Sequence, residues 1–146
     1  MPSVKIRKQP QRRFLPSFGE LCDRLSICQQ KQIFIPKHRE VYTKQINDIV
    51  FDLDMICKEK KLGINGTFIR LTIIVTHMNT WIWENEKNYR NGVKTGNNLE
   101  LTHSLNTIRT TAYSMLSQFV GDRGEYKKDT AIPHKDWIPS LFENKT

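Results

Sequence analysis

The sequence predicts an all-α protein, an antiparallel bundle of about four helices with a basic N-terminal arm and an irregular C-terminal tail. Apolar residues recur at spacings of three and four in four separate stretches of the 146-residue chain, and the connections between them are short and rich in glycine, proline or asparagine. Amphipathic helices joined by short loops bury their apolar faces against antiparallel neighbours. We therefore expect a flexible basic arm at 1–16, a helical bundle domain at 17–121, and an irregular tail at 122–146 that packs on the bundle.

The first helix is predicted to begin at Ser17. Its hydroxyl can accept a hydrogen bond from a free amide of the first turn while Glu20 reaches back to the Ser17 amide, which is a capping box. The apolar residues that follow form a stripe that faces the core: Phe18, Leu21, Leu25 and Cys28. We expect this helix to fade near Gln32, because Pro36 favours an extended connection before it.

A second helix is predicted over about 38–62. Its apolar residues repeat at spacings of four and three: Tyr42, Ile46, Ile49, Leu53 and Ile56. The basic run from Lys58 to Lys61 complements the negative end of the helix dipole, and Gly63 is expected to end the helix.

The third segment is rich in β-branched residues from Phe68 to Thr76 and resembles a buried strand over that range. Its length decides between the two structures. No helix breaker stands between Thr67 and Asn91, which is too long for one strand, so we predict a helix that ends at Gly92.

A fourth helix is predicted from Asn98, which can cap it, to Gly121, which can end it. Its core-facing stripe consists of Leu101, Leu105, Ile108, Ala112, Met115 and Phe119. The tail that follows contains Pro133 and Pro139 and is expected to be irregular. Its predicted anchors on the bundle are Ile132, Trp137, Ile138, Leu141 and Phe142.

The chain carries a net charge of +8, and much of this charge is concentrated in the arm. The first 16 residues contain no acidic residue and five basic ones: Lys5, Arg7, Lys8, Arg12 and Arg13. Such an arm can attract the phosphates of a nucleic acid, and these five residues are the candidate nucleic-acid contacts. No interleaved aromatic residues accompany them to stack on bases.

The sequence gives no indication of a membrane or secreted protein. No apolar run approaches the roughly 18 residues of a membrane span, and no apolar segment follows the basic residues of the arm as in a secretory signal. Cys22, Cys28 and Cys57 are odd in number and share no CxxC spacing. We expect buried free thiols in a reducing cell rather than disulfides or a zinc site.

Polar residues stand beside or within the apolar stripes of the first, third and fourth helices. On the third, the spacing from Asn79 to Arg90 places four such residues on one face. If these three helices are neighbours, their polar residues converge on one pocket. The candidate ligand-binding residues are Glu20, Asp23, Arg24, Asn79, Trp83, Glu86, Arg90, Asn106 and Arg109.

These side chains suit a phosphorylated small molecule. The guanidinium of an arginine can bind two phosphate oxygens at once. Asparagines can orient a sugar or base, and Trp83 offers a stacking face. A structural alternative assigns Glu20 to the capping box, the arginines to solvated helix edges and Trp83 to the core. The sequence leaves both interpretations open.

A third interpretation is catalytic. Glu20 and Asp23 lie on one helical turn and could share Mg²⁺ with Glu86, as in a metal-dependent hydrolase; otherwise no metal or cofactor is expected. The ExxD pair is similar to that of all-helical nucleoside triphosphate pyrophosphohydrolases. Those enzymes carry an ExxE motif on an earlier helix, and only the basic arm precedes Glu20 here.

Three motifs resemble those of an uncharacterised family of short helical proteins from bacteriophages and bacteria, some encoded beside glycosyltransferases. The opening G-E-L-C-D-R-L-S-I at 19–27 fits the family form GELxD[RK]x[ST]I. The motif N-x-x-x-W-x-x-E-x-x-x-R follows at 79–90, and L-N-T-I-R stands at 105–109. The resemblance covers roughly 17–125 and implies that the polar residues form a matched set.

The expected function is therefore that of a small accessory protein, acting in the host cytoplasm if viral, that binds a nucleotide, a nucleotide sugar or another phosphorylated small ligand between its helices. The first alternative is a nucleic-acid-binding accessory protein that uses the basic arm, and the second is the Mg²⁺-dependent nucleotide hydrolase. A protein inhibitor or scaffold that uses the tail is a further option, and homo-oligomer formation is left open.

Overall fold

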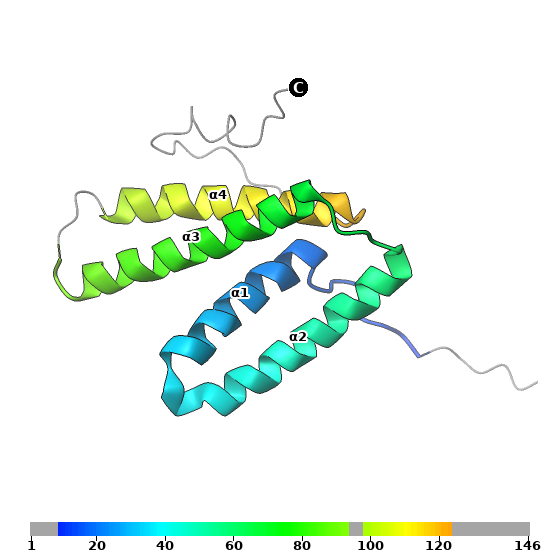
Figure 1. Ribbon diagram of the computed structural model, residues 1–146, viewed down its shortest axis with the longest axis horizontal. Coiled ribbons are helices and arrows are strands. Elements are labelled where there is room, and N and C mark those ends of the chain that lie inside the picture. The colour runs from blue at the N-terminus through cyan, green and yellow to red at the C-terminus, as the bar shows by residue number, and fades with distance from the viewer. Residues whose placement is uncertain (1–8, 94–97, 124–146) are drawn as a thin grey trace, which may run out of the picture.

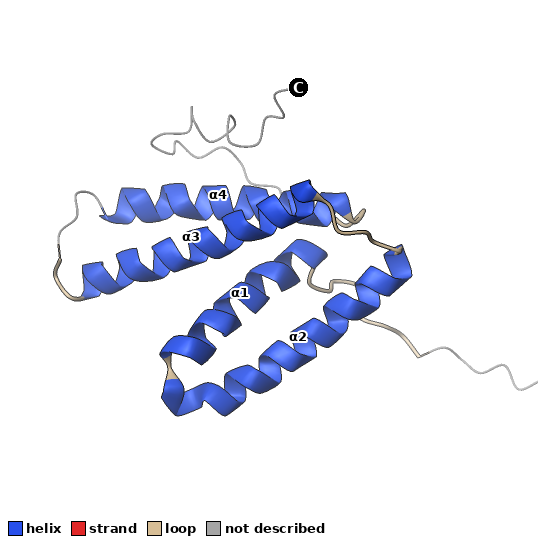
Figure 2. Cartoon of the chain, in the orientation of Figure 1, coloured by secondary structure: helices blue, strands red, loops and turns tan. Residues whose placement is uncertain are grey.

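A computed structural model describes residues 9–93 and 98–123. Within these residues the chain is helical and contains no strand, as Figure 2 shows. The α-helices are α1 (Phe18–Phe34), α2 (Arg39–Lys60), α3 (Gly66–Arg90) and α4 (Asn98–Phe119), and a short 3-10 helix, η1 (Pro36–His38), precedes α2. The predicted all-α fold is confirmed. None of the described helices has the length and apolar content that crossing a membrane requires.

Local sequence signals account for several of the helix ends. The Ser17 hydroxyl accepts a hydrogen bond from the Glu20 amide at 3.3 Å, and the Glu20 carboxylate accepts one from the Ser17 amide at 2.6 Å, so the capping box is confirmed. Asn65 caps α3 by accepting a hydrogen bond from the Phe68 amide at 2.9 Å. Gly92 and Gly121 follow α3 and α4 with φ of 73° and 80°, which glycine adopts without strain.

Two predicted boundaries are wrong. Helix α1 continues to Phe34, and the connection at Pro36 is a 3-10 turn rather than an extended segment, since proline is well suited to the first position of a helical turn. Helix α2 ends at Lys60, before Gly63, because Lys61 takes the left-handed conformation with φ of 50°. The next residue, Leu62, packs on the core and donates its amide to the Cys57 carbonyl at 3.1 Å, so the chain reverses before the glycine.

The helices form two antiparallel hairpins, α1 with α2 and α3 with α4 (Figure 1). Helix α1 contacts the other three helices, whereas α2 contacts only α1 and η1 among the described elements. The buried core joins α1 to the second hairpin and consists of Phe18, Leu71, Val75, Ala112, Leu116 and Val120. The predicted stripe of α2 is half-buried, and α2 contains no fully buried residue.

The start of α1 is fixed to the end of α4. A Cβ atom added to Gly19 would lie 1.7 Å from the Tyr113 carbonyl oxygen, so only glycine allows this approach. The Gly19 amide donates to the Ser117 hydroxyl at 2.8 Å, and the Phe18 amide donates to the Asp122 carboxylate at 2.9 Å. These long-range bonds satisfy free amides of α1 and set its position along α4.

Candidate functional site

Three of the predicted site residues meet where α1, α3 and α4 contact one another. The Asn79 side-chain amide donates to the Asp23 carboxylate at 2.9 Å and to the Ser26 hydroxyl at 3.2 Å. Nη1 of Arg109 donates to the Asn79 side-chain oxygen at 3.1 Å. We call Asp23, Ser26, Asn79 and Arg109 the polar junction. Each of its three helices contributes at least one polar group to it.

Helical spacing explains why these residues meet. Asp23 and Ser26 are three positions apart and lie on one side of α1. Asn79 stands on the apolar stripe of α3, one turn after Val75, and is only 4% exposed. On α4, Arg109 follows the buried Ile108, and its guanidinium reaches Asn79 on α3. The polar junction therefore continues the core rather than lying on the outer surface.

The guanidinium of Arg109 keeps an unused donor. Its Nε lies 3.8 Å from the Asp23 carboxylate, close enough for an ion pair, and the two side chains are 24% and 16% exposed. This Nε is buried and has no hydrogen-bond partner among the described residues. A buried donor without an acceptor costs about 1–3 kcal/mol, and more for a charged group, and the ion pair with Asp23 offsets part of this cost.

Glu20 and Arg24 lie on α1 outside this hydrogen-bonded set. The Glu20 carboxylate completes the capping box and forms an ion pair with Arg123 at 3.5 Å. Arg123 also donates to the Leu15 carbonyl and stacks on the Phe14 ring at 4.1 Å. These contacts agree with the structural alternative, in which Glu20 belongs to the capping box. Arg24 follows Asp23 in the chain and its side chain is exposed.

The remaining candidates extend from the polar junction along α3 and α4. Trp83 is one turn after Asn79, and Asn106 is one turn before Arg109; both are half-buried. Because α3 and α4 are antiparallel, these two steps run in the same direction. Glu86 and Arg90 follow on α3 and are exposed. The predicted stripe therefore leads from the buried Asn79 to solvent.

The acidic residues of the hydrolase interpretation do not come together. Within residues 9–93 and 98–123, no group of three or more His, Cys, Asp or Glu side chains is placed to hold a metal ion. Glu20, Asp23 and Glu86 therefore do not form such a group within the described residues. Of the candidate nucleic-acid contacts, Arg12 and Arg13 are exposed, while Lys5, Arg7 and Lys8 lie outside the described residues, as do the predicted tail anchors.

One buried polar residue was missed by the sequence analysis. Asn85 is 4% exposed, and its amide donates to the Asn98 carbonyl at 2.7 Å and to the Thr102 hydroxyl at 2.6 Å. It fixes the start of α4 against α3. The signal was present, because Asn85 continues the stripe of Leu71, Val75, Asn79 and Ile82 at helical spacing, and a polar residue on such a stripe indicates a buried hydrogen bond.

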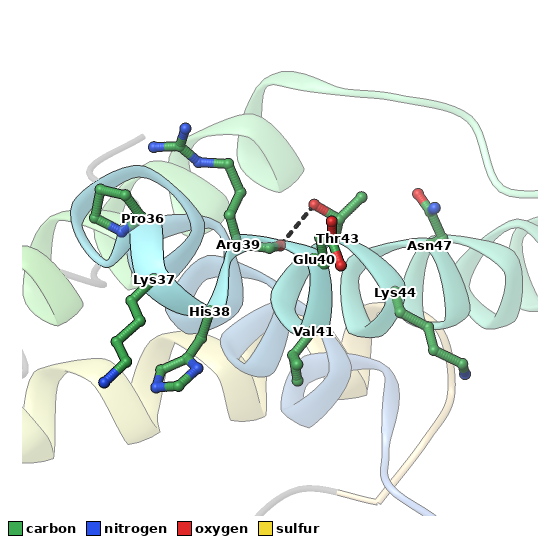
Figure 3. A pocket seen from close by; sticks show the side chains of 9 residues that line it. All are labelled: Pro36, Lys37, His38, Arg39, Glu40, Val41, Thr43, Lys44 and Asn47. Atoms are coloured by element: carbon green, nitrogen blue, oxygen red, sulfur yellow. Dashed lines mark hydrogen bonds between the residues drawn. The ribbon is translucent and has the colours of Figure 1, made fainter.

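A hollow of about 860 Å³ at the start of α2 is a weaker candidate. Figure 3 shows its lining side chains arranged around η1 and the first turns of α2, with Lys37 and Lys44 on one side and Arg39 on another. All but Thr43 are exposed, and Thr43 bonds to the Arg39 carbonyl. Because these side chains point apart, they do not converge on a ligand.

The described cysteines are free, as predicted. Burial raises the pKa of Cys22 to about 12, with smaller contributions from the nearby Cys57 and Asp23. The Cys22 thiol therefore stays protonated at neutral pH and is a poor nucleophile. Cys28 is buried and donates to the Gln45 side chain at 3.4 Å.

Comparison of the chain with known protein families, with curated proteins and with solved structures finds no match.

Proposed function

We propose that the protein binds a phosphorylated small molecule, such as a nucleotide or a nucleotide sugar, at the polar junction. One observation carries this proposal: the buried Nε of Arg109 lacks an acceptor although polar groups from three helices surround it. The Arg109 side chain is 24% exposed, and a phosphate oxygen is a strong acceptor for a guanidinium N–H.

The neighbouring charges are compatible with an anion. Asp23 already accepts a hydrogen bond from Asn79 and pairs with Arg109, so its negative charge is offset. Its role in the proposal is to orient Arg109. Arg24 is exposed on the same helix and is the candidate for a second guanidinium contact with the phosphate.

The half-buried side chains along α3 and α4 would receive the rest of the ligand. Asn106 can pair with a sugar or base because its amide offers both donors and an acceptor. The Trp83 indole has a large face on which a base could stack. Each of the three motifs on which the expected resemblance rests contributes at least one residue to the polar junction.

A thermal-shift screen of the full chain against nucleotides, nucleotide sugars, inorganic phosphate and oligonucleotides tests the proposal. A ligand that binds the native state at one hundred times its Kd stabilises it by about 2.7 kcal/mol, so the midpoint rises. We expect a rise with a small phosphorylated ligand that is lost in Arg24→Gln and retained in Lys58→Gln, an exposed control on α2.

The screen also separates this function from nucleic-acid binding by the arm. Binding that requires residues 1–13 and decreases steeply with salt would assign the activity to the arm and contradict the proposal. A midpoint that stays constant with every small phosphorylated ligand would contradict it as well.

A further inference from the structure

An apolar groove of about 550 Å³ lies between α1, α2 and α3. It exists because α2 packs on α1 and leaves the adjoining faces of α1 and α3 uncovered. Apolar side chains from all three helices line it, among them Leu25, Ile33, Phe34, Val50, Leu53 and Phe68. None of its lining residues is charged, although charged residues make up 26% of the chain.

The groove leaves large apolar side chains in contact with water. Ile33 is 56% exposed, Phe34 65% and Val50 40%. A contiguous apolar surface of this kind usually marks a place where another segment binds. The absence of charge in the lining argues against a phosphate group or a nucleic acid as the occupant and favours an uncharged apolar segment.

We propose that the groove is the docking site of the chain's own segment 124–146. The described chain stops at Arg123, directly after α4. Asp122 accepts a hydrogen bond from the Phe18 amide at 2.9 Å, and the Phe18 side chain lines the groove. The last described residues therefore lie beside one end of the groove.

The composition of the segment matches that of the groove. Residues 124–146 contain four lysines and four acidic residues, so their charges cancel. Within them, W-I-P-S-L-F at 137–142 has no charge and offers four large apolar side chains. This uncharged run would cover the apolar lining without burying a charge.

The segment is also long enough. Helix α1 has 17 residues and spans about 26 Å at a rise of 1.5 Å per residue. From Arg123 to Trp137 the chain advances 14 residues, which can extend to roughly 46 Å. The apolar run can therefore reach any point of the groove. A tether of this length gives an effective concentration in the millimolar range, which favours the chain's own segment over a second copy.

The groove thiols provide a test in the full chain. Cys22 and Cys57 line the groove, and Cys28, which does not line it, serves as an internal reference. The measurement is the alkylation rate of each cysteine by mass spectrometry, in the native chain and in a Trp137→Asp, Leu141→Asp double variant. A control variant, Thr130→Asp with Asn144→Asp, adds the same charge outside the apolar run.

We expect Cys57 to react on the order of tenfold faster in the Trp137→Asp, Leu141→Asp variant, with Cys28 unchanged. The control variant should react like the native chain, and the rates should be independent of protein concentration because the contact is intramolecular. Equal Cys57 rates in the native chain and the apolar-run variant would overturn the proposal. A dimer in solution, with Cys57 protection that increases with concentration, would overturn it in favour of a second copy.

Discussion

At the scale of single residues, close contacts decide which substitutions the molecule accepts. Gly19 and Gly63 illustrate the difference. A Cβ on Gly19 would meet the Tyr113 carbonyl, whereas a Cβ on Gly63 has no neighbour within 4 Å. The first glycine is thus required by the contact of α1 with α4, and the second is not required by packing.

We predict that Gly19→Ala lowers the free energy of unfolding by about 3 kcal/mol or more, because α1 must move away from α4. The amide of residue 19 then loses its hydrogen bond to the Ser117 hydroxyl. Gly63→Ala is the matched control and should change stability by less than about 1 kcal/mol. Urea denaturation of both variants measures the difference. Equal midpoints would contradict the close approach.

A second residue-scale prediction concerns Cys22. Its pKa rises from an ordinary value of 9.0 to about 12 in the folded protein, because burial disfavours the thiolate. Between pH 9 and 12 the unfolded chain therefore releases a proton that the native state keeps, so native stability falls as pH rises through that window. The Cys22 contribution is fully present below pH 9.

Cys22→Ala should accordingly lose stability less steeply than the native chain from pH 9 to 12, by a few kcal/mol over the whole window. Below pH 9 the two curves should differ by a constant packing contribution. Denaturant titrations at several pH values measure this, and other titrating groups cancel in the comparison. Parallel curves above pH 9 would show that the Cys22 thiol is not buried.

At the scale of secondary-structure elements, the sequence predicts the positions of the helices much better than it predicts the residues that meet at the site. Apolar periodicity and capping residues locate the four helices, because both act within a few residues of chain. The end of α2 is different. Lys61 takes the left-handed position although Gly63 is available, since the burial of Leu62 decides where the chain reverses.

This end of α2 gives a third prediction. Lys61→Gly should stabilise the protein by up to about 1 kcal/mol, because glycine adopts a positive φ more readily than lysine does. Lys58→Gly, inside the last turn of α2, should destabilise it by about 1 kcal/mol. Thermal unfolding of the two variants measures these changes in stability. Changes of the same sign in both variants would contradict the left-handed conformation of Lys61.

Periodicity also limits what can be predicted about the site. It gives the face of a helix on which a side chain stands, but not its level relative to the neighbouring helices. Asp23, Asn79 and Arg109 share both face and level and therefore meet. Glu20 is one turn too early on α1 and is used by the capping box. The level is set by long-range contacts such as that of Gly19 with Tyr113, which no local pattern shows.

At the scale of the whole molecule, the arrangement of the two hairpins creates both proposed binding surfaces. The contact of α1 with α3 and α4 forms the polar junction, and the position of α2 on α1 leaves the groove open. Ser26 belongs to both, since it lines the groove and accepts a hydrogen bond from Asn79. A ligand bound at either surface would therefore lie close to the Ser26 side chain.

The central claim is that the polar junction binds a phosphorylated ligand through Arg109. Isothermal titration of the full chain with the ligand from the screen tests it directly, in the native protein and in Arg109→Lys, Arg24→Gln and Lys58→Gln. Lysine keeps the charge of Arg109 but lacks its Nε–H and planar fork. We predict a Kd at least about tenfold weaker, or about 1.4 kcal/mol, in the first two variants and an unchanged Kd in the third. Equal affinity in all four proteins would contradict the account.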